Sequence, residues 1–232
     1  MNLEKKKILV VAAHPDDDIL GCGGTLAKAV SLKAKVKIIF LGEGVTSRFD
    51  FGEENSVRSK KANEVRNREC LESLKVIGIK NHVFENRLCT RFDELPLLNL
   101  VKSIEREIKS FRPNVIFTHN RSEVNIDHKL TYDAVEVACR PINKKFLKQV
   151  YSFEIVCSGN WKFEKNFSPT TYVDITKFFK KKLISWSKYK NENNKFPHPR
   201  SKLGIETLAR YRGMQSNTLF AEAFKLEREI II

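Results

Sequence analysis

The sequence predicts an α/β fold in which helices cover both faces of a mainly parallel sheet. Residues 8–13 form a continuous apolar run rich in β-branched side chains, which is typical of a strand buried on both faces of a parallel sheet. Strand-like and helix-like segments then alternate through the first two thirds of the chain. This alternation is the pattern of a doubly wound sheet.

The individual elements follow from apolar periodicity and from the residues that end each run. Gly78 follows one periodic segment as a helix stop, and Pro141 ends another. Residues 46–58 are polar, so we expect a loop there. The expected strands are 8–13, 36–41, 82–84, 114–118, 150–156 and 172–175, and the expected helices are 21–30, 59–77, 95–111, 128–140, 177–191 and 202–212.

The size of the chain predicts a single domain over residues 1–232. Its 232 residues, 41% of them hydrophobic, can build one sizeable core. After about residue 158 the composition shifts towards Lys, Asn, Phe and Pro, with no linker that would separate a second domain. We therefore expect residues 158–232 to form a cap over the site of that domain.

Two features favour a cytoplasmic location. The apolar run at residues 8–13 is too short for a secretory signal or a membrane span. The five cysteines are widely spaced and contain no CxxC pair, which argues against a disulfide framework and for a reducing compartment.

The formal net charge of +14 favours an anionic partner, such as a nucleotide, a lipid phosphate or a nucleic acid. Residues 177–190 mix basic and aromatic side chains, as segments that contact membranes or nucleic acids do. Such a run is more often a solvated helix face, which is the interpretation we favour. There is no strong nucleic-acid signal, although a nucleic-acid-binding module, which would not require His14 or His128, is a non-enzyme alternative. Peripheral membrane contact stays open, and the sequence does not indicate an oligomeric state.

Polar clusters follow three of the expected strands. They lie at residues 14–18, 43–50 and 119–128. Ligands of open α/β sheets bind beyond the carboxyl ends of the strands. We therefore expect these three clusters to converge on one site.

The first cluster supplies a candidate metal site together with His128. His14 and Asp17 are three residues apart in a tight turn, so their side chains can point to one spot. Two imidazoles and a carboxylate suit zinc with an open coordination position, and Asp16 could accept the proton of a reacting water. Asp18 is left for supporting the ligands or for capping the next helix. Pure helix capping is the alternative for the whole turn, but it needs only one acid and does not explain His128.

These residues resemble the LmbE/PIG-L family of zinc-dependent N-deacetylases. The resemblance rests on Ala-His-Pro-Asp-Asp-Asp at residues 13–18, on Gly21 and Gly24-Thr25, and on Asp127-His128 far downstream. It implies a Rossmann-like three-layer sandwich and an N-acetylated amino-sugar substrate. It also implies roles for individual residues: His14, Asp17 and His128 as zinc ligands, Asp16 as general base, and Asp127 as part of the catalytic group.

The resemblance extends into the last third of the chain. Residues 197–201 and 221–224 resemble the tail of members found with bacterial surface-polysaccharide genes. This implies a role in the biosynthesis of such a polysaccharide.

The chain departs from the family pattern at two positions. Asp18 stands where the family usually has Glu, and Asn125 stands where many members have a histidine that stabilises the oxyanion. An amide can donate a hydrogen bond but cannot carry a positive charge. We therefore consider three candidates for the oxyanion role: His198, His119 and Asn125 itself. His119, at the end of a buried strand, is equally well explained as a structural histidine.

Three further residues are candidates for substrate binding. The resemblance implies this role for Arg48, and Arg200 could bind an anionic group of the substrate. Glu222 could accept hydrogen bonds from sugar hydroxyls. The alternatives are a solvated loop charge for Arg48, a rigid surface turn around Arg200 and a helix-surface acid for Glu222. The basic composition favours a phosphate-containing carrier on the sugar.

Other functions are compatible with parts of this pattern. An N-deformylase, or another hydrolase of small amides, would use the same chemistry. A phosphoreceiver module would need an aspartate after a central strand and a lysine after a late one, which residues 84–88 and 156–158 do not supply. The glycines at 21–24 lack the GxGxxG and GK[ST] patterns of nucleotide-binding loops.

Overall fold

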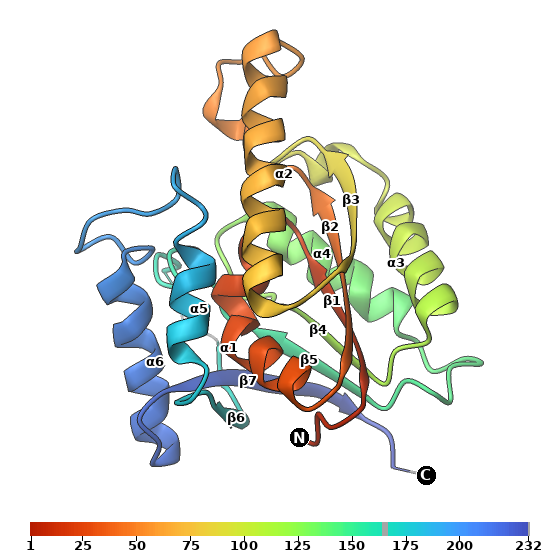
Figure 1. The fold of residues 1–232 in the computed structure, drawn as a ribbon. Helices are drawn as coiled ribbons and strands as arrows, with labels where there is room; N and C mark the ends of the chain where they lie inside the picture. The colour runs from red at the N-terminus through yellow and green to blue at the C-terminus, as the bar shows by residue number, and fades with distance from the viewer. Residues whose placement is uncertain (164–166, 232) are drawn as a thin grey trace.

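A seven-stranded sheet forms the centre of the computed structural model, which describes residues 1–163 and 167–231 (Figure 1). Strands β1 to β5 pair in parallel, β7 is antiparallel to β5, and β6 is antiparallel to β7. The predicted α/β fold with a mainly parallel sheet is confirmed. The spatial order is β3 (Asn81–Arg87), β2 (Lys35–Gly42), β1 (Lys7–Ala12), β4 (Val115–His119), β5 (Gln149–Phe153), β7 (Ala221–Glu229) and β6 (Thr171–Asp174).

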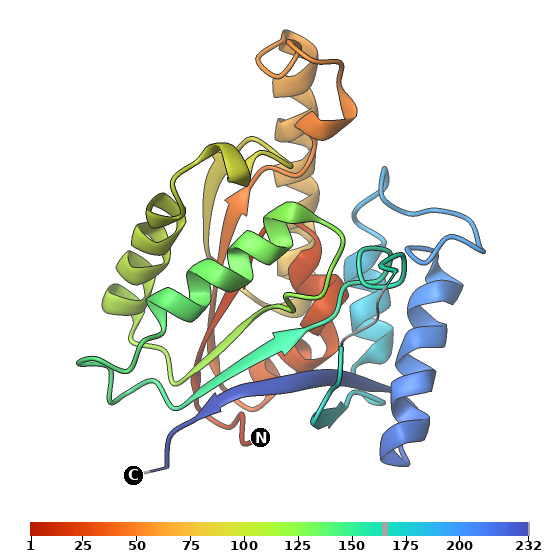
Figure 2. The ribbon, with the colours of Figure 1, turned by 180° about the vertical axis from the view of Figure 1, so that it is seen from behind.

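Helices cover both faces of this sheet and complete three layers (Figures 1 and 2). One side carries α1 (Asp17–Ser31), α2 (Val57–Ile77) and α5 (Phe179–Trp186), with α6 (Lys202–Ser216) packed on β7, and the other carries α3 (Leu97–Phe111) and α4 (Ile126–Ala138). Two short 3-10 turns, η1 (Thr46–Arg48) and η2 (Phe92–Glu94), follow β2 and β3. In the described part of the chain, no helix combines the length and apolar character that crossing a bilayer requires.

The central strand β1 supplies both cores, which explains its uninterrupted apolar sequence. Ile8 and Val10 belong to the cluster under α1 and α2, whereas Leu9 and Val11 belong to the cluster under α3 and α4. All four side chains are fully buried. Alternation along a strand sends neighbouring side chains to opposite faces, so a strand covered on both faces has no polar position.

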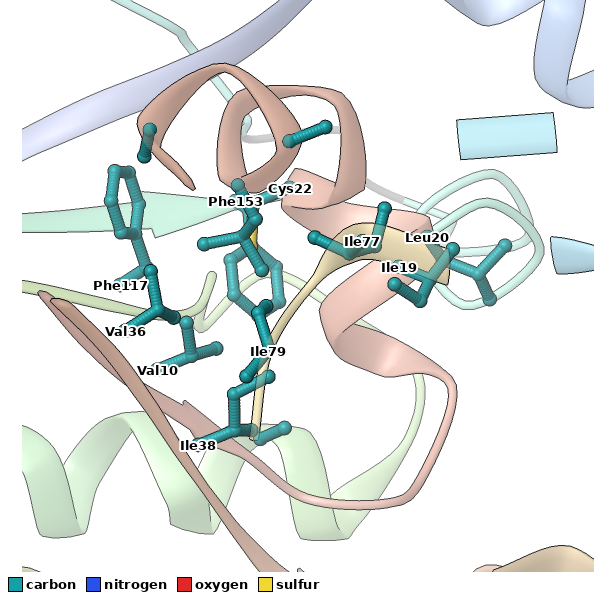
Figure 3. Packing of buried hydrophobic residues seen from close by; sticks show 14 of the residues in the cluster. Val10, Ile19, Leu20, Cys22, Val36, Ile38, Ile77, Ile79, Phe117 and Phe153 are labelled. Carbon is teal, nitrogen blue, oxygen red and sulfur yellow. The ribbon is translucent and has the colours of Figure 1, made fainter. Parts of the chain in front are cut away.

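Helix α1 starts at Asp17, four residues earlier than the sequence predicted. The glycines therefore lie inside the helix, where its axis kinks at Cys22 (φ −145°). A Cβ on Gly21 would lie 2.4 Å from the ring of Phe153, and one on Gly24 would lie 2.7 Å from Ile175. The glycines thus let α1 approach the sheet closely, as the packing around Phe153 and Cys22 in Figure 3 shows.

The C-terminal region completes the sheet as well as covering it. The predicted strand at residues 172–175 is confirmed as β6, whereas the nine-residue strand β7, which lies between β5 and β6, was not predicted. Residues 164–166 and 232 of the predicted cap lie outside the described residues.

The prediction that the basic segment at residues 177–190 is only a solvated helix face is wrong. Its helix α5 is only eight residues long, and Lys182 is buried. The ammonium of Lys182 donates to the carbonyl of Leu20 (2.8 Å) and to Glu222 (2.6 Å). A lysine buried with such partners ties α5 to α1 and to β7.

Candidate active site

The candidate site lies at the carboxyl ends of β1 and β4, where two of the predicted polar clusters meet. The turn after β1 carries His14, Asp16 and Asp17, and the first turn of α4 carries Asp127 and His128. All five side chains are buried. The parallel arrangement of the two strands brings these segments together although more than a hundred residues separate them.

Three donor atoms converge in this place. The Oδ2 atom of Asp17 lies 3.6 Å from Nδ1 of His14 and 3.5 Å from Nε2 of His128. The three residues form a group whose ligand atoms all lie within 4.8 Å of one another. These are the residues that the sequence indicated as ligands.

The other ring nitrogen of each histidine is held by a carboxylate. Nε2 of His14 hydrogen-bonds to Asp127 (2.8 Å), and Nδ1 of His128 hydrogen-bonds to Glu123. Each carboxylate is in turn fixed by main-chain donors: Asp127 accepts from the N–H of Thr90 (2.6 Å), and Glu123 from that of Ile155 (2.8 Å). Such partners fix the tautomer and the ring orientation of a metal-binding histidine. The remaining nitrogens, Nδ1 of His14 and Nε2 of His128, therefore keep their lone pairs free on the side of Asp17.

The residues fit a divalent metal ion. The Oδ1 atom of Asp17 is buried and has no hydrogen-bond partner among the described residues, an arrangement that costs free energy unless something binds there. Although burial opposes ionisation, the neighbouring His128 and His119 lower the pKa of Asp17. A carboxylate between two oriented imidazoles is a donor set that suits zinc with an open position.

Asp16 lies on the opposite side of the same turn, among arginines. Its Oδ2 atom accepts hydrogen bonds from Arg66 (2.9 Å) and from Arg200 (3.4 Å). Glu192 joins these two guanidinium groups, since it accepts from Arg66 and from Arg200 (2.7 Å), and it also pairs with Arg48 (2.6 Å). We call Arg48, Arg66, Glu192 and Arg200 the arginine cluster.

The environment of Asp16 favours a carboxylate that can take up a proton. Burial raises its pKa, and the charges of Arg200 and Arg66 offset only part of that effect. The residue also has a positive φ of 126°, a conformation that L residues rarely adopt. Strained backbone of this kind is concentrated at functional sites.

Asp18 does not cap the helix, which corrects one of the two roles considered for it. It lies within the first turn of α1, and both of its buried oxygens are without a hydrogen-bond partner among the described residues. Burial, together with the charge of Asp16, raises the pKa of Asp18 to about 8. This carboxyl group is therefore harder to ionise than that of an exposed aspartate.

The three candidates for the oxyanion role have different hydrogen bonds. Nε2 of His119 accepts from the N–H of Ala13 (2.9 Å), so that nitrogen is committed to the main chain. Asn125 is the N-cap of α4, where its Oδ1 accepts from Asp127 (2.9 Å) and leaves its amide nitrogen as a donor. Nδ1 of His198 accepts from the N–H of Arg200 (3.1 Å), which leaves its Nε2–H as a donor.

Glu222 is not part of this site, contrary to our expectation. It lies buried on β7 and accepts hydrogen bonds from the N–H groups of Gly24 (2.9 Å) and Thr25 (2.7 Å), in addition to the ammonium of Lys182. Both carboxylate oxygens are used within the protein. The residue connects α1, α5 and β7, and both of its oxygens already accept hydrogen bonds within the protein rather than from a sugar.

Sequence reasoning missed four residues beside the site. Glu123 lies within the polar cluster 119–128, so its position was a usable signal. Cys89, whose sulfur lies 3.5 Å from Nε2 of His14, follows β3 and had no such signal. Arg66 in the middle of α2 and Glu192 after α5 also gave no local pattern that would distinguish them from surface charges.

Together, the fold and these side chains define a Rossmann-like α/β protein with a candidate metal site of two histidines and one carboxylate at the ends of its parallel strands. A family model described as PIG-L, GlcNAc-PI de-N-acetylase, matches residues 9–139, more than half of the chain. The chain belongs to the PIG-L family. The matched region contains the complete set of donor atoms and the turn that carries Asp16.

Known proteins resemble the chain over most of its length. An uncharacterised deacetylase of Escherichia coli, YaiS, is 27% identical over 194 residues, which cover 81% of this chain and 92% of the relative. The N,N'-diacetylchitobiose deacetylase of Pyrococcus horikoshii has the same fold, with a TM-score of 0.76 and 20% identity over 96% of this chain and 84% of its own.

Another solved structure shows that the fold alone does not specify the reaction. The 4-carboxy-2-hydroxymuconate hydratase GalB of Pseudomonas putida matches with a TM-score of 0.75 and 18% identity over 98% of both chains. Function must therefore be argued from the site.

Proposed function

We propose that the protein is a zinc-dependent hydrolase that removes the N-acetyl group from an amino sugar. The observation that carries the proposal is the convergence of His14, Asp17 and His128, with each imidazole oriented by a buried carboxylate. Membership of the PIG-L family and the similarity to a deacetylase of Escherichia coli support it.

The proposed metal site divides the chemistry between the ion and the protein. A zinc ion held by His14, Asp17 and His128 would polarise the amide carbonyl and make a water molecule acidic enough to react near neutral pH. Asp127 and Glu123 keep the two imidazoles in the orientation that this requires.

Asp16 performs the proton transfers in this proposal. Its buried carboxylate takes a proton from the attacking water and later delivers it to the departing amine. Water thereby adds across the amide bond: the acyl carbon gains an oxygen, the C–N bond breaks, and acetate and a free amino sugar result. Arg66 and Arg200 hold the carboxylate of Asp16 in position through their hydrogen bonds.

A donor from the protein stabilises the negative oxygen that develops during the attack. Asn125 and His198 each keep an N–H free for this purpose. In His119, Nε2 accepts from the N–H of Ala13, and the remaining donor, Nδ1, lies 3.6 Å from the carboxylate of Glu123. We therefore assign the role to His198 or Asn125 and a structural role to His119.

The substrate of the proposal is an amino sugar on a phosphate-containing carrier. The net charge of +14 supports an anionic group on the substrate, and Arg48 and Arg200 border Asp16 through Glu192. The tail motifs at residues 197–201 and 221–224 favour a role in building a bacterial surface polysaccharide. Peripheral contact with a membrane would suit a lipid carrier.

Metal analysis followed by an acetate-release assay tests the proposal. The purified protein should contain near-stoichiometric zinc, and it should release acetate and an equal amount of free amine from nucleotide-linked, lipid-linked or free N-acetylamino sugars. Formate release from N-formyl analogues with no acetate release would establish the deformylase instead. A zinc-loaded protein that hydrolyses none of these amides would overturn the proposal.

A further inference from the structure

A cavity of about 300 Å³ lies on the other side of Arg66 from Asp16, between η1 and the N-terminal half of α2. Figure 1 shows this part of α2 projecting beyond the sheet, beside the loop that follows β2. Four basic side chains line the cavity: Arg48, Arg58, Lys61 and Arg66. Nothing in the proposed hydrolysis requires Arg58 or Lys61.

The positive charge of the cavity is only partly neutralised by the described residues of the protein. Glu69 is its only acidic lining residue among those described, and one of its oxygens accepts from the N–H of Lys190 (3.1 Å). Arg48 and Arg66 pair with Glu192, but no ion pair holds Arg58 or Lys61 in the described part of the chain. These two cations are available to an anionic ligand.

Arg58 is held in place although it has no acidic partner. Its guanidinium group lies 5.5 Å from the ring centre of Phe49, which also lines the cavity. A cation over an aromatic face is attracted to the ring and loses some of its freedom. The guanidinium N–H groups remain free to bind a phosphate in a forked geometry.

The placement of these cations also costs helix stability. Arg58 and Lys61 lie in the opening turns of α2, which contain no acidic residue in the first turn. Cations are unfavourable at the positive end of a helix dipole, most of all in the first turn, where Arg58 lies. A bound anion would turn this cost into a favourable interaction.

The cavity and the candidate active site share a wall. Arg66 lines the cavity and donates to Asp16, and Arg48 lines the cavity and pairs with Glu192 of the arginine cluster. A group bound here therefore lies one side chain away from Asp16. In a 2-acetamido sugar joined to a phosphate at its anomeric carbon, the acetamido group and the phosphate stand on adjacent ring carbons.

We propose that this cavity binds the phosphate or diphosphate of the substrate's carrier, with Arg58 and Lys61 as direct contacts. The inference rests on the proposed function, because it places the sugar amide at Asp16. A nucleoside diphosphate and a lipid diphosphate both present this chemistry. Recognition of the phosphate selects sugars that carry it over free sugars.

Direct binding of inorganic phosphate tests the cavity without reference to catalysis. Calorimetry at low ionic strength compares the wild type with a double variant, Arg58→Ala and Lys61→Ala. A matched control, Lys60→Ala and Arg68→Ala, removes two charges from exposed positions of the same helix that do not line the cavity. We expect at least a tenfold loss of affinity in the cavity variant, corresponding to one lost charge-assisted hydrogen bond, and less than a twofold loss in the control.

Kinetics with three substrates then distinguish the sources of the phosphate. The cavity variant should raise KM about tenfold or more for the phosphate-linked sugar that the enzyme uses, nucleotide-linked or lipid-linked, and leave kcat/KM unchanged for the free N-acetylamino sugar. Zinc content and circular dichroism show whether the variants fold.

Two results would overturn the inference: equal loss of phosphate binding in both double variants, or absence of saturable phosphate binding in the wild type. If no amide is hydrolysed but phosphate binding depends on Arg58 and Lys61, the proposed function fails and the anion site stands.

Discussion

Asp16 and Asp17 are neighbours in the chain, yet different side chains surround their carboxylates. Asp17 lies among imidazoles, between His14 and His128. Asp16 lies among guanidinium groups, and both carboxylates are almost fully buried. Of the two, Asp16 alone has a positive φ (126°).

This difference shows how one tight turn supplies two kinds of carboxylate. The environment of Asp17 lowers its pKa and keeps it ionised, as a metal ligand must be. Burial raises the pKa of Asp16, which brings it closer to the range useful for proton transfer. Pairs of carboxyl groups whose surroundings separate their pKa values commonly divide the work of an active site in this way.

The comparison is tested most strongly by replacing each aspartate with asparagine. Asp16→Asn should lower the rate of acetate release by about 10²- to 10⁴-fold, because an amide cannot accept the proton of water. Its zinc content should stay near stoichiometric. Asp17→Asn should lose both zinc and activity, since it removes a charged ligand. Acetate release and metal analysis on the same samples measure both effects.

The two variants serve as controls for each other, because both replace a buried aspartate of the same turn with asparagine. Asn fills the same volume as Asp and also tolerates a positive φ, so both proteins should fold. Loss of zinc from Asp16→Asn would place this residue with the ligands, and wild-type activity in that variant would remove it from catalysis. An exposed aspartate on β6, replaced in Asp174→Asn, should change neither quantity.

The histidine side of the turn could be predicted from the sequence, whereas the arginine side could be predicted only in part: Arg48 and Arg200 were candidates for substrate binding, but Arg66 and Glu192 were not. His14 and Asp17 follow a strand whose uninterrupted apolar sequence marks it as central, and His128 begins the helix after another such strand. Rules for parallel sheets then bring these segments to the same edge. Local pattern and topology were sufficient here.

The arginine cluster depends on how three remote segments pack. Arg66 comes from the middle of α2, and Glu192 and Arg200 come from the irregular segment between α5 and α6. A buried arginine in a helix rich in Lys and Arg has the same sequence signature as an exposed one. The strand β7 was missed for a similar reason: its second half, residues 225–229, is mostly charged, and its position is set by pairing with β5 and β6.

The next largest effect should separate the two candidates for stabilising the oxyanion. Asn125→Asp keeps the N-cap of α4 but removes the amide donor, and His198→Ala removes the imidazole donor. The variant that lacks the true donor should lose about 10²- to 10³-fold in kcat, the usual effect of removing one oxyanion-hole donor.

KM and zinc content should change little in either variant, because neither residue is a proposed ligand. His119→Ala should instead lower thermal stability, since it leaves the buried N–H of Ala13 without an acceptor. Full kcat in both donor variants would leave the oxyanion to the metal alone.

The smallest expected effects come from replacing two buried glutamates. Glu123 supports His128 on the histidine side of the turn, and Glu192 belongs to the arginine cluster beside Asp16. Glu123→Gln weakens the hold on His128, so zinc affinity should fall about 10- to 100-fold, as is common when a ligand's carboxylate partner is lost. Glu192→Gln leaves the histidines untouched, so zinc affinity should stay within about twofold of the wild type. Acetate release should still fall, because Arg66 and Arg200 lose the charge that positions them.

Competition with a chelator measures the zinc affinity of both variants. Saturating zinc in the assay separates the two causes, because it should restore activity to Glu123→Gln but not to Glu192→Gln. Restoration of both, or of neither, would mean that the two sides of the turn do not act separately.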